Sequence, residues 1–127
     1  MGKYGQTAIK AVNLIQKNPE ISPDDAWEKA VVEIFGNKTV NQTKKCPKGI
    51  FLGLCEEGLV KGIKKGKYTK SKMNKQYAIK GLKLINEDPV LCENESLLWI
   101  KVMGGYGKKY NFQMDVIISL REENLIW

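Results

Sequence analysis

The sequence contains no histidine and only one arginine, Arg121, among its 21 basic residues. Without histidine, the chain lacks the usual general base of serine and cysteine hydrolases and a common zinc ligand. The near absence of arginine argues against bidentate recognition of guanine. The sequence also has neither the Gly-x-Ser-x-Gly motif of hydrolases nor the phosphate-binding Gly-x-x-x-x-Gly-Lys-Ser/Thr motif. We therefore expect a protein that is not an enzyme and holds neither a cofactor nor a metal.

Cysteines are few, and long apolar runs are missing. Cys46, Cys55 and Cys92 cannot all pair, and their spacing fits no zinc motif. Cys55 falls on an apolar helical stripe, where a cysteine usually acts as a small buried hydrophobe. No apolar run reaches the ~20 residues that cross a bilayer, and the first residues lack the apolar core of a signal peptide. These features predict a cytoplasmic protein that makes no membrane contact.

Lysine is abundant, and it is concentrated in the middle of the chain. The net charge is +7, but residues 36–76 alone carry +9, from eleven lysines and two acids. Such a segment can hold a phosphate backbone, while a tyrosine stacks on a base. The alternative is a solvated connector whose charge keeps the protein soluble. The candidate residues are Lys44, Lys45, Lys48, Lys61, Lys64, Lys65, Lys67, Tyr68, Lys70, Lys72 and Lys75.

Short motifs occur twice, in the same order, in the two halves of the chain. Order is kept while the spacing between motifs changes, as expected when elements repeat and loops vary. We therefore predict two three-helix copies, residues 4–60 and 74–127, joined by a lysine-rich linker, residues 61–73. The matched motifs are Ala8-Ile9-Lys10 with Ala78-Ile79-Lys80, Trp27-x-Lys29 with Trp99-x-Lys101, and Glu56-Glu57-Gly58-Leu59-Val60 with Glu122-Glu123-Asn124-Leu125-Ile126.

Apolar residues at helical spacing predict about six helices, and no segment alternates as a strand would. The helices are expected near residues 5–17, 22–36, from 47 onward, 74–86, 94–103 and 112–124. Ser22 and Asn111 are expected to cap the second and sixth of them. Gly49 and Gly53, one turn apart, predict the close approach of another helix. The fold class is therefore all-α, a duplicated three-helix unit packed as one compact globule.

Several other features favour structural roles. Trp27 and Trp99 occupy matched positions and are expected to anchor the core. The acidic pair Glu56-Glu57 is expected to form salt bridges with nearby lysines, because adjacent helical side chains diverge by about 100° and serve poorly as an acid–base pair. A helix-turn-helix fits poorly, since loops of about eight to ten residues replace its tight turn. Trp127 either seals the bundle or belongs to a partner-binding patch.

Three stretches of the sequence carry a family resemblance. They are Cys46-Pro47-Lys48-Gly49-Ile50-Phe51-Leu52-Gly53-Leu54-Cys55-Glu56-Glu57-Gly58-Leu59-Val60, then Tyr68-Thr69-x-Ser71-Lys72, and Gln113-Met114-Asp115-Val116. Together they resemble a family of small bacterial proteins that carries a domain-of-unknown-function label. The resemblance spans most of the chain and implies a shared fold. It implies no activity, cofactor or site residue.

The sequence therefore predicts a small non-catalytic protein that acts through surface contacts with another macromolecule. The favoured partner is nucleic acid or another acidic macromolecule, bound weakly and with little sequence preference through the lysines. The alternative is a protein-binding or regulatory adaptor module that uses a groove between the two copies or the surface around Trp127.

Overall fold

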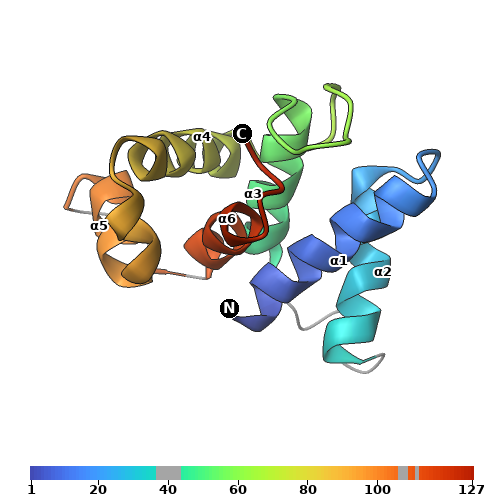
Figure 1. The fold of residues 1–127 in the computed structure, drawn as a ribbon, viewed down its shortest axis with the longest axis horizontal. Helices are drawn as coiled ribbons and strands as arrows, with labels where there is room; N and C mark the ends of the chain where they lie inside the picture. Colours follow the sequence, from blue (N-terminus) through green and yellow to red (C-terminus); the bar gives the residue numbers. More distant parts are fainter. Residues whose placement is uncertain (37–43, 106–108, 111) are drawn as a thin grey trace.

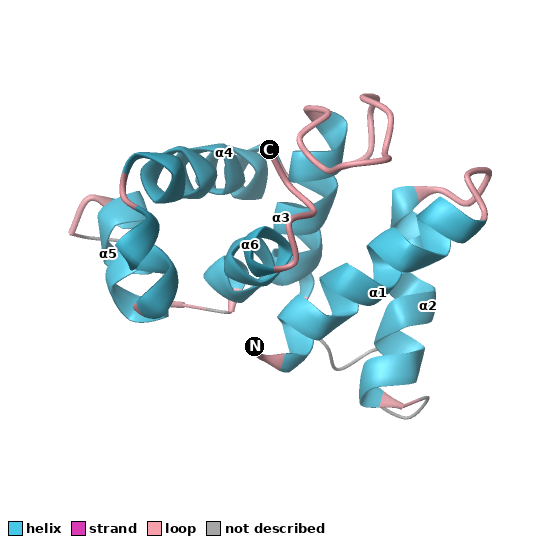
Figure 2. Ribbon diagram, viewed as in Figure 1, coloured by secondary structure: helices cyan, strands magenta, loops and turns pink. Residues whose placement is uncertain are grey.

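The computed structural model describes residues 1–36, 44–105, 109–110 and 112–127. These residues are all-α, as predicted, and the described ranges contain no strand (Figure 2). No helix in the described ranges is both long and apolar enough to span a membrane. The elements are α1 (Lys3–Lys17), α2 (Pro23–Phe35), α3 (Lys45–Glu56), α4 (Lys72–Glu87), the 3-10 helix η2 (Pro89–Glu93), α5 (Glu95–Met103) and α6 (Gln113–Glu122).

Helices α3 and α6 form the centre of the molecule, with α1 and α2 on one side and α4 and α5 on the other (Figure 1). Helix α1 packs on α6, and α4 packs on α3, so each predicted copy contacts the other through its first helix. One hydrophobic core includes side chains from all six helices. Trp27 is 1% exposed and packs against Phe51 in a tilted arrangement, with ring centroids 5.3 Å apart, and Trp99 is also buried. The predicted core role of both tryptophans is confirmed.

Side-chain caps set the starts of several helices. The hydroxyl of Ser22 accepts a hydrogen bond from the Asp25 amide at 3.1 Å, which confirms the predicted cap of α2. Ser71 caps α4 in the same way, and this helix therefore begins at Lys72, two residues before the predicted start. The predicted cap Asn111 lies outside the described residues. Instead, the hydroxyl of Tyr110 accepts hydrogen bonds from the first amides of α6, those of Met114 and Asp115, at 3.1 and 3.2 Å.

Two glycines allow α3 and α4 to approach closely, as the sequence predicts. A methyl group at Gly53 would lie 2.8 Å from the Cα of Lys75, and one at Gly49 would lie 2.9 Å from the side chain of Asn74. Both distances are shorter than van der Waals contact allows. The backbone of α4 therefore occupies the space that a larger residue on α3 would need. This contact brings the start of α4 next to the end of α3.

The segments that follow α3 and α6 pair with each other. Val60 and Ile126 form an isolated antiparallel bridge. The amide of Lys61 donates to the carbonyl of Leu125 at 2.8 Å, and the amide of Trp127 donates to the carbonyl of Leu59 at 3.0 Å. Residues at matched positions of the two predicted copies thus exchange equivalent hydrogen bonds. An internal twofold relation would produce such reciprocal contacts, although the duplication itself stays a prediction.

Candidate functional site

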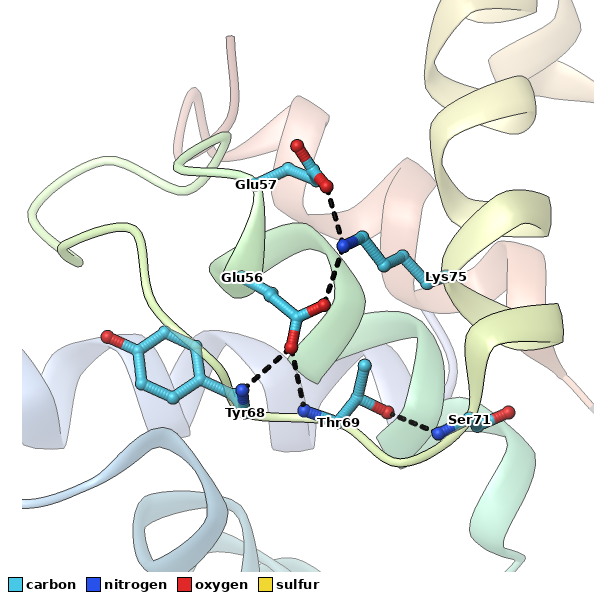
Figure 3. Close-up of polar contacts among 6 residues, drawn as sticks. All are labelled: Glu56, Glu57, Tyr68, Thr69, Ser71 and Lys75. Atoms are coloured by element: carbon cyan, nitrogen blue, oxygen red, sulfur yellow. Dashed lines mark hydrogen bonds and ion pairs between the residues drawn. The ribbon is translucent and has the colours of Figure 1, made fainter.

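Glu56, in the last turn of α3, holds the lysine-rich linker in place (Figure 3). Its Oε1 accepts hydrogen bonds from the amides of Tyr68 at 2.8 Å and Thr69 at 3.2 Å. Its Oε2 accepts one from Nζ of Lys75 on α4 at 2.6 Å. The hydroxyl of Thr69 in turn accepts from the amide of Ser71 at 3.1 Å. This part of the linker is therefore fixed against the ends of two helices.

Lys75 bridges two adjacent carboxylates. Its Nζ lies 2.6 Å from both Glu56 Oε2 and Glu57 Oε1, so the predicted salt bridges of the acidic pair are confirmed. The hydrogen bond from Lys75, followed by those from the linker amides, lowers the pKa of Glu56 to about 2. The hydrogen bonds that Lys75 donates to Glu56 and Glu57 raise the pKa of Lys75 above its ordinary value. Lys75, a predicted phosphate contact, is therefore already engaged by two acids.

Two grooves flank the linker where Glu56 fixes it. The first has a volume of about 710 Å³ and lies between the linker and helices α2 and α3. The second has a volume of about 620 Å³ and lies between the linker, the end of α3 and the first two turns of α4. Thr69 and Lys70 line both grooves, so the two hollows adjoin across the linker. We call them the first groove and the second groove.

Exposed lysines from distant parts of the sequence meet at these grooves. Lys44 and Lys45, at the start of α3, line the first groove, and Lys67 and Lys72 line the second. Lys70 lines both. The structure thus places five of the predicted cations along one pair of adjoining hollows. The two lysines at the start of α3 and the three in and after the linker are more than 20 residues apart in the sequence, and the packing of the linker onto α3 brings them together.

Lys48 also lines the first groove, but its charge is balanced by α2. Its Nζ lies 2.6 Å from Glu28 Oε1 and 3.1 Å from Asp24 Oδ1. Burial lowers the pKa of Lys48, but the hydrogen bonds to Glu28 and Asp24 outweigh this effect and raise it. Lys48 therefore partly neutralises the acidic wall of the first groove and contributes little free positive charge.

The remaining predicted residues lie elsewhere or are constrained. Lys61 Nζ lies 4.8 Å from the ring centroid of Trp127, in cation–π geometry, and donates to Asn124 Oδ1 at 3.0 Å. Lys64 and Lys65 are exposed but line neither groove. Tyr68 is half-buried, and its hydroxyl donates to the carbonyl of Lys64 at 2.6 Å. Tyr68 is therefore held in place where it lines the first groove.

Sequence reasoning missed the organising role of Glu56 and the apolar lining of the grooves. The buried residues Leu52 and Trp27 lie at the base of the first groove, and the exposed Ile79 contributes to the second. The pair Glu56-Glu57 just before a lysine-rich segment was the available signal for the ion pairs. Nothing local indicated that the backbone amides of Tyr68 and Thr69 would bind the same carboxylate.

Comparison with known proteins adds one finding about the chain. A family model described as "Family of unknown function (DUF6979)" matches residues 1–127. No curated protein and no solved structure gives a significant match.

Proposed function

The chain belongs to the family of unknown function DUF6979, and from its own geometry we propose that it is a non-catalytic protein that binds nucleic acid with low sequence specificity. The observation that carries the proposal is the gathering of five exposed lysines around the two adjoining grooves: Lys44, Lys45, Lys67, Lys70 and Lys72. The carboxylates that line the same grooves, Asp24, Glu28 and Glu56, are paired with Lys48 or Lys75. The grooves therefore keep an excess of positive charge.

Lysine chemistry determines the kind of binding that we expect. A lysine ammonium contacts phosphate as a point charge and reads no base, so affinity comes from the backbone and depends on salt. If all five lysines contact phosphates of a single strand, the logarithm of the association constant should fall with the logarithm of salt concentration with a slope of roughly −3.5. This slope distinguishes a lysine-lined site from an apolar one.

The test is fluorescence anisotropy of labelled DNA and RNA with the purified protein at about 50 and 200 mM salt, where phosphate contacts change most. Replacing Lys44, Lys45 and Lys70 with glutamate should abolish measurable binding at the lower salt. A matched control replaces Lys29, Lys83 and Lys109, which are exposed and line neither groove. Both variants change the net charge equally, so an equal loss of affinity would refute the groove as the site. Circular dichroism checks that the helices are retained.

A protein partner is the second candidate, and the exposed ring of Trp127 favours it. This side chain is 64% exposed, which is high for a tryptophan, and it lies beside Lys61. Binding of this kind should survive high salt and should be lost in Trp127→Ala. The outcome that favours it is a nucleic-acid titration without signal at low salt, together with a recovered partner that the Trp127 variant fails to bind.

A further inference from the structure

We propose that the ligand is single-stranded nucleic acid, which lies in both grooves and crosses the linker at residues 69–70. This inference rests on the proposed function and names its substrate class. It follows from the shape of the charged surface and from the apolar residues that line it.

The positive charge lines hollows and not a projecting element. A duplex is read by a helix or ribbon that enters its major groove, about 12 Å wide. Here the exposed lysines lie along two open grooves that meet at Thr69 and Lys70. A groove lined by cations follows the backbone of a single strand. Lys70, which lines both grooves, continues the cationic path across the linker.

The grooves also contain apolar surface, which only a single strand can use fully. The half-buried Tyr68 lines the first groove, and Ile79 lines the second with 39% of its surface exposed. Unpaired bases expose their faces and gain free energy by contacting aromatic or aliphatic side chains. In a duplex these faces are stacked on each other. The combination of lysines with apolar walls therefore matches a strand whose phosphates contact the lysines and whose bases contact Tyr68 and Ile79.

The first experiment compares three polyanions with the unmodified protein at one salt concentration. They are a labelled strand of about 16 nucleotides, near the upper site size of such grooves, its duplex, and unlabelled inorganic polyphosphate as a competitor. We expect the strand to bind about tenfold more tightly than the other two, an amount in the range of one base contact. A duplex that binds equally well overturns the single-strand inference but leaves the proposed function intact. Polyphosphate that competes as well as the unlabelled strand shows that the bases make no contact, and it overturns the inference too. If neither the labelled strand nor its duplex binds, the proposed function itself is refuted.

The second experiment isolates the apolar contact. Ile79→Ala should weaken strand binding about threefold, through lost apolar area, and leave the salt slope and polyphosphate competition unchanged. Val90→Ala is the matched control, because Val90 is 67% exposed on η2 and lines neither groove. Equal strand affinities of the two variants would remove Ile79 from the site and contradict the assigned path of the strand.

Discussion

Three donors converge on the carboxylate of Glu56, and they come from the linker and from α4. Because the carboxylate fixes the linker between the two grooves, it positions Lys70. We therefore expect Glu56→Gln to weaken polyanion binding, although the substitution makes the protein more positive. Charge attraction alone predicts that the substitution increases the affinity for a polyanion. An affinity that rises in anisotropy titrations would therefore contradict the positioning role.

Glu57→Gln is the matched control for this substitution. It makes the same change of charge and removes one partner of Lys75, but it leaves the contacts between Glu56 and the linker amides intact. We expect its affinity to equal or exceed that of the unmodified protein. A loss as large as that of Glu56→Gln would assign the effect to Lys75 and not to the linker.

The lowered pKa of Glu56 also makes stability depend on pH. The folded pKa of about 2 lies below the ordinary value of 4.5, so the folded state favours the charged carboxylate. This stabilisation is complete above pH 4.5 and is lost as the pH falls towards 2. Urea titrations of the free energy of unfolding should therefore show a smaller acid dependence in Glu56→Gln over this window. If the free energy of unfolding changed with pH in the same way in both proteins, the lowered pKa of Glu56 would be contradicted.

Asp115 of α6 acts as a cap for α1. Its carboxylate accepts hydrogen bonds from the amides of Gly2 at 2.9 Å and Gly5 at 2.8 Å, and from the hydroxyl of Ser119 at 3.1 Å, while the residue is only 3% exposed. Asp115→Asn leaves at least one buried donor without its charged acceptor and should cost about 1–3 kcal/mol in the free energy of unfolding. Urea denaturation measures this loss. Asp25→Asn, on an exposed first turn, is the control and should cost clearly less.

Sequence reasoning at the residue scale succeeded where the cause is local. Ser22 caps the helix that follows it, and Cys55 is buried on the stripe that its neighbours define. Glu56 and Asp115 could not be assigned in this way. Apart from the Ser119 hydroxyl, one turn from Asp115, their donors lie 12 to 113 positions away along the chain, and only the packing of the helices brings them together.

At the scale of elements, the contact between α3 and α4 depends on small residues. Alanine at Gly53 would place a methyl group 2.8 Å from the backbone of Lys75 and force the helices apart. We expect Gly53→Ala to destabilise the protein by about 1–3 kcal/mol, despite the gain of about 1 kcal/mol in helix propensity. Asn13→Ala, on the exposed face of α1, is the control and should stabilise slightly. A Gly53 variant more stable than the parent in urea denaturation would refute the close approach.

Helices were predicted more reliably than their ends and connections. Apolar periodicity found all six, because each buries one continuous stripe. Helix α3 begins at Lys45, two residues before Pro47, since proline is tolerated within the first turn. The sequence does not predict the 3-10 helix η2, because a proline after a helical segment indicates the end of that helix, and Pro89 here also opens the next one. Within the candidate site, the sequence identifies the lysines as candidate contacts. It does not predict the grooves that they line, because these form when the linker folds back onto α3.

At the scale of the whole molecule, one core joins both predicted copies, and the segment after α6 helps to close it. Ile126 is 6% exposed and pairs with Val60 across the centre. Ile126→Ala should lower the free energy of unfolding by about 2–4 kcal/mol. Far-UV circular dichroism and tryptophan fluorescence should still report one shared transition. Two separated transitions would mean that the halves unfold independently, contrary to a single core.

The capping of α1 by Asp115 has a consequence for the order of folding. The ribosome makes α1 before the other described helices, yet its leading amides find their acceptor only after position 115 has been synthesised. Contacts between residues this far apart slow folding, because a long loop must close before they form. In pulse-labelled hydrogen exchange during refolding, the amides of Gly2 and Gly5 should therefore gain protection together with α6. The described helix that is synthesised earliest would then be among the last to become complete.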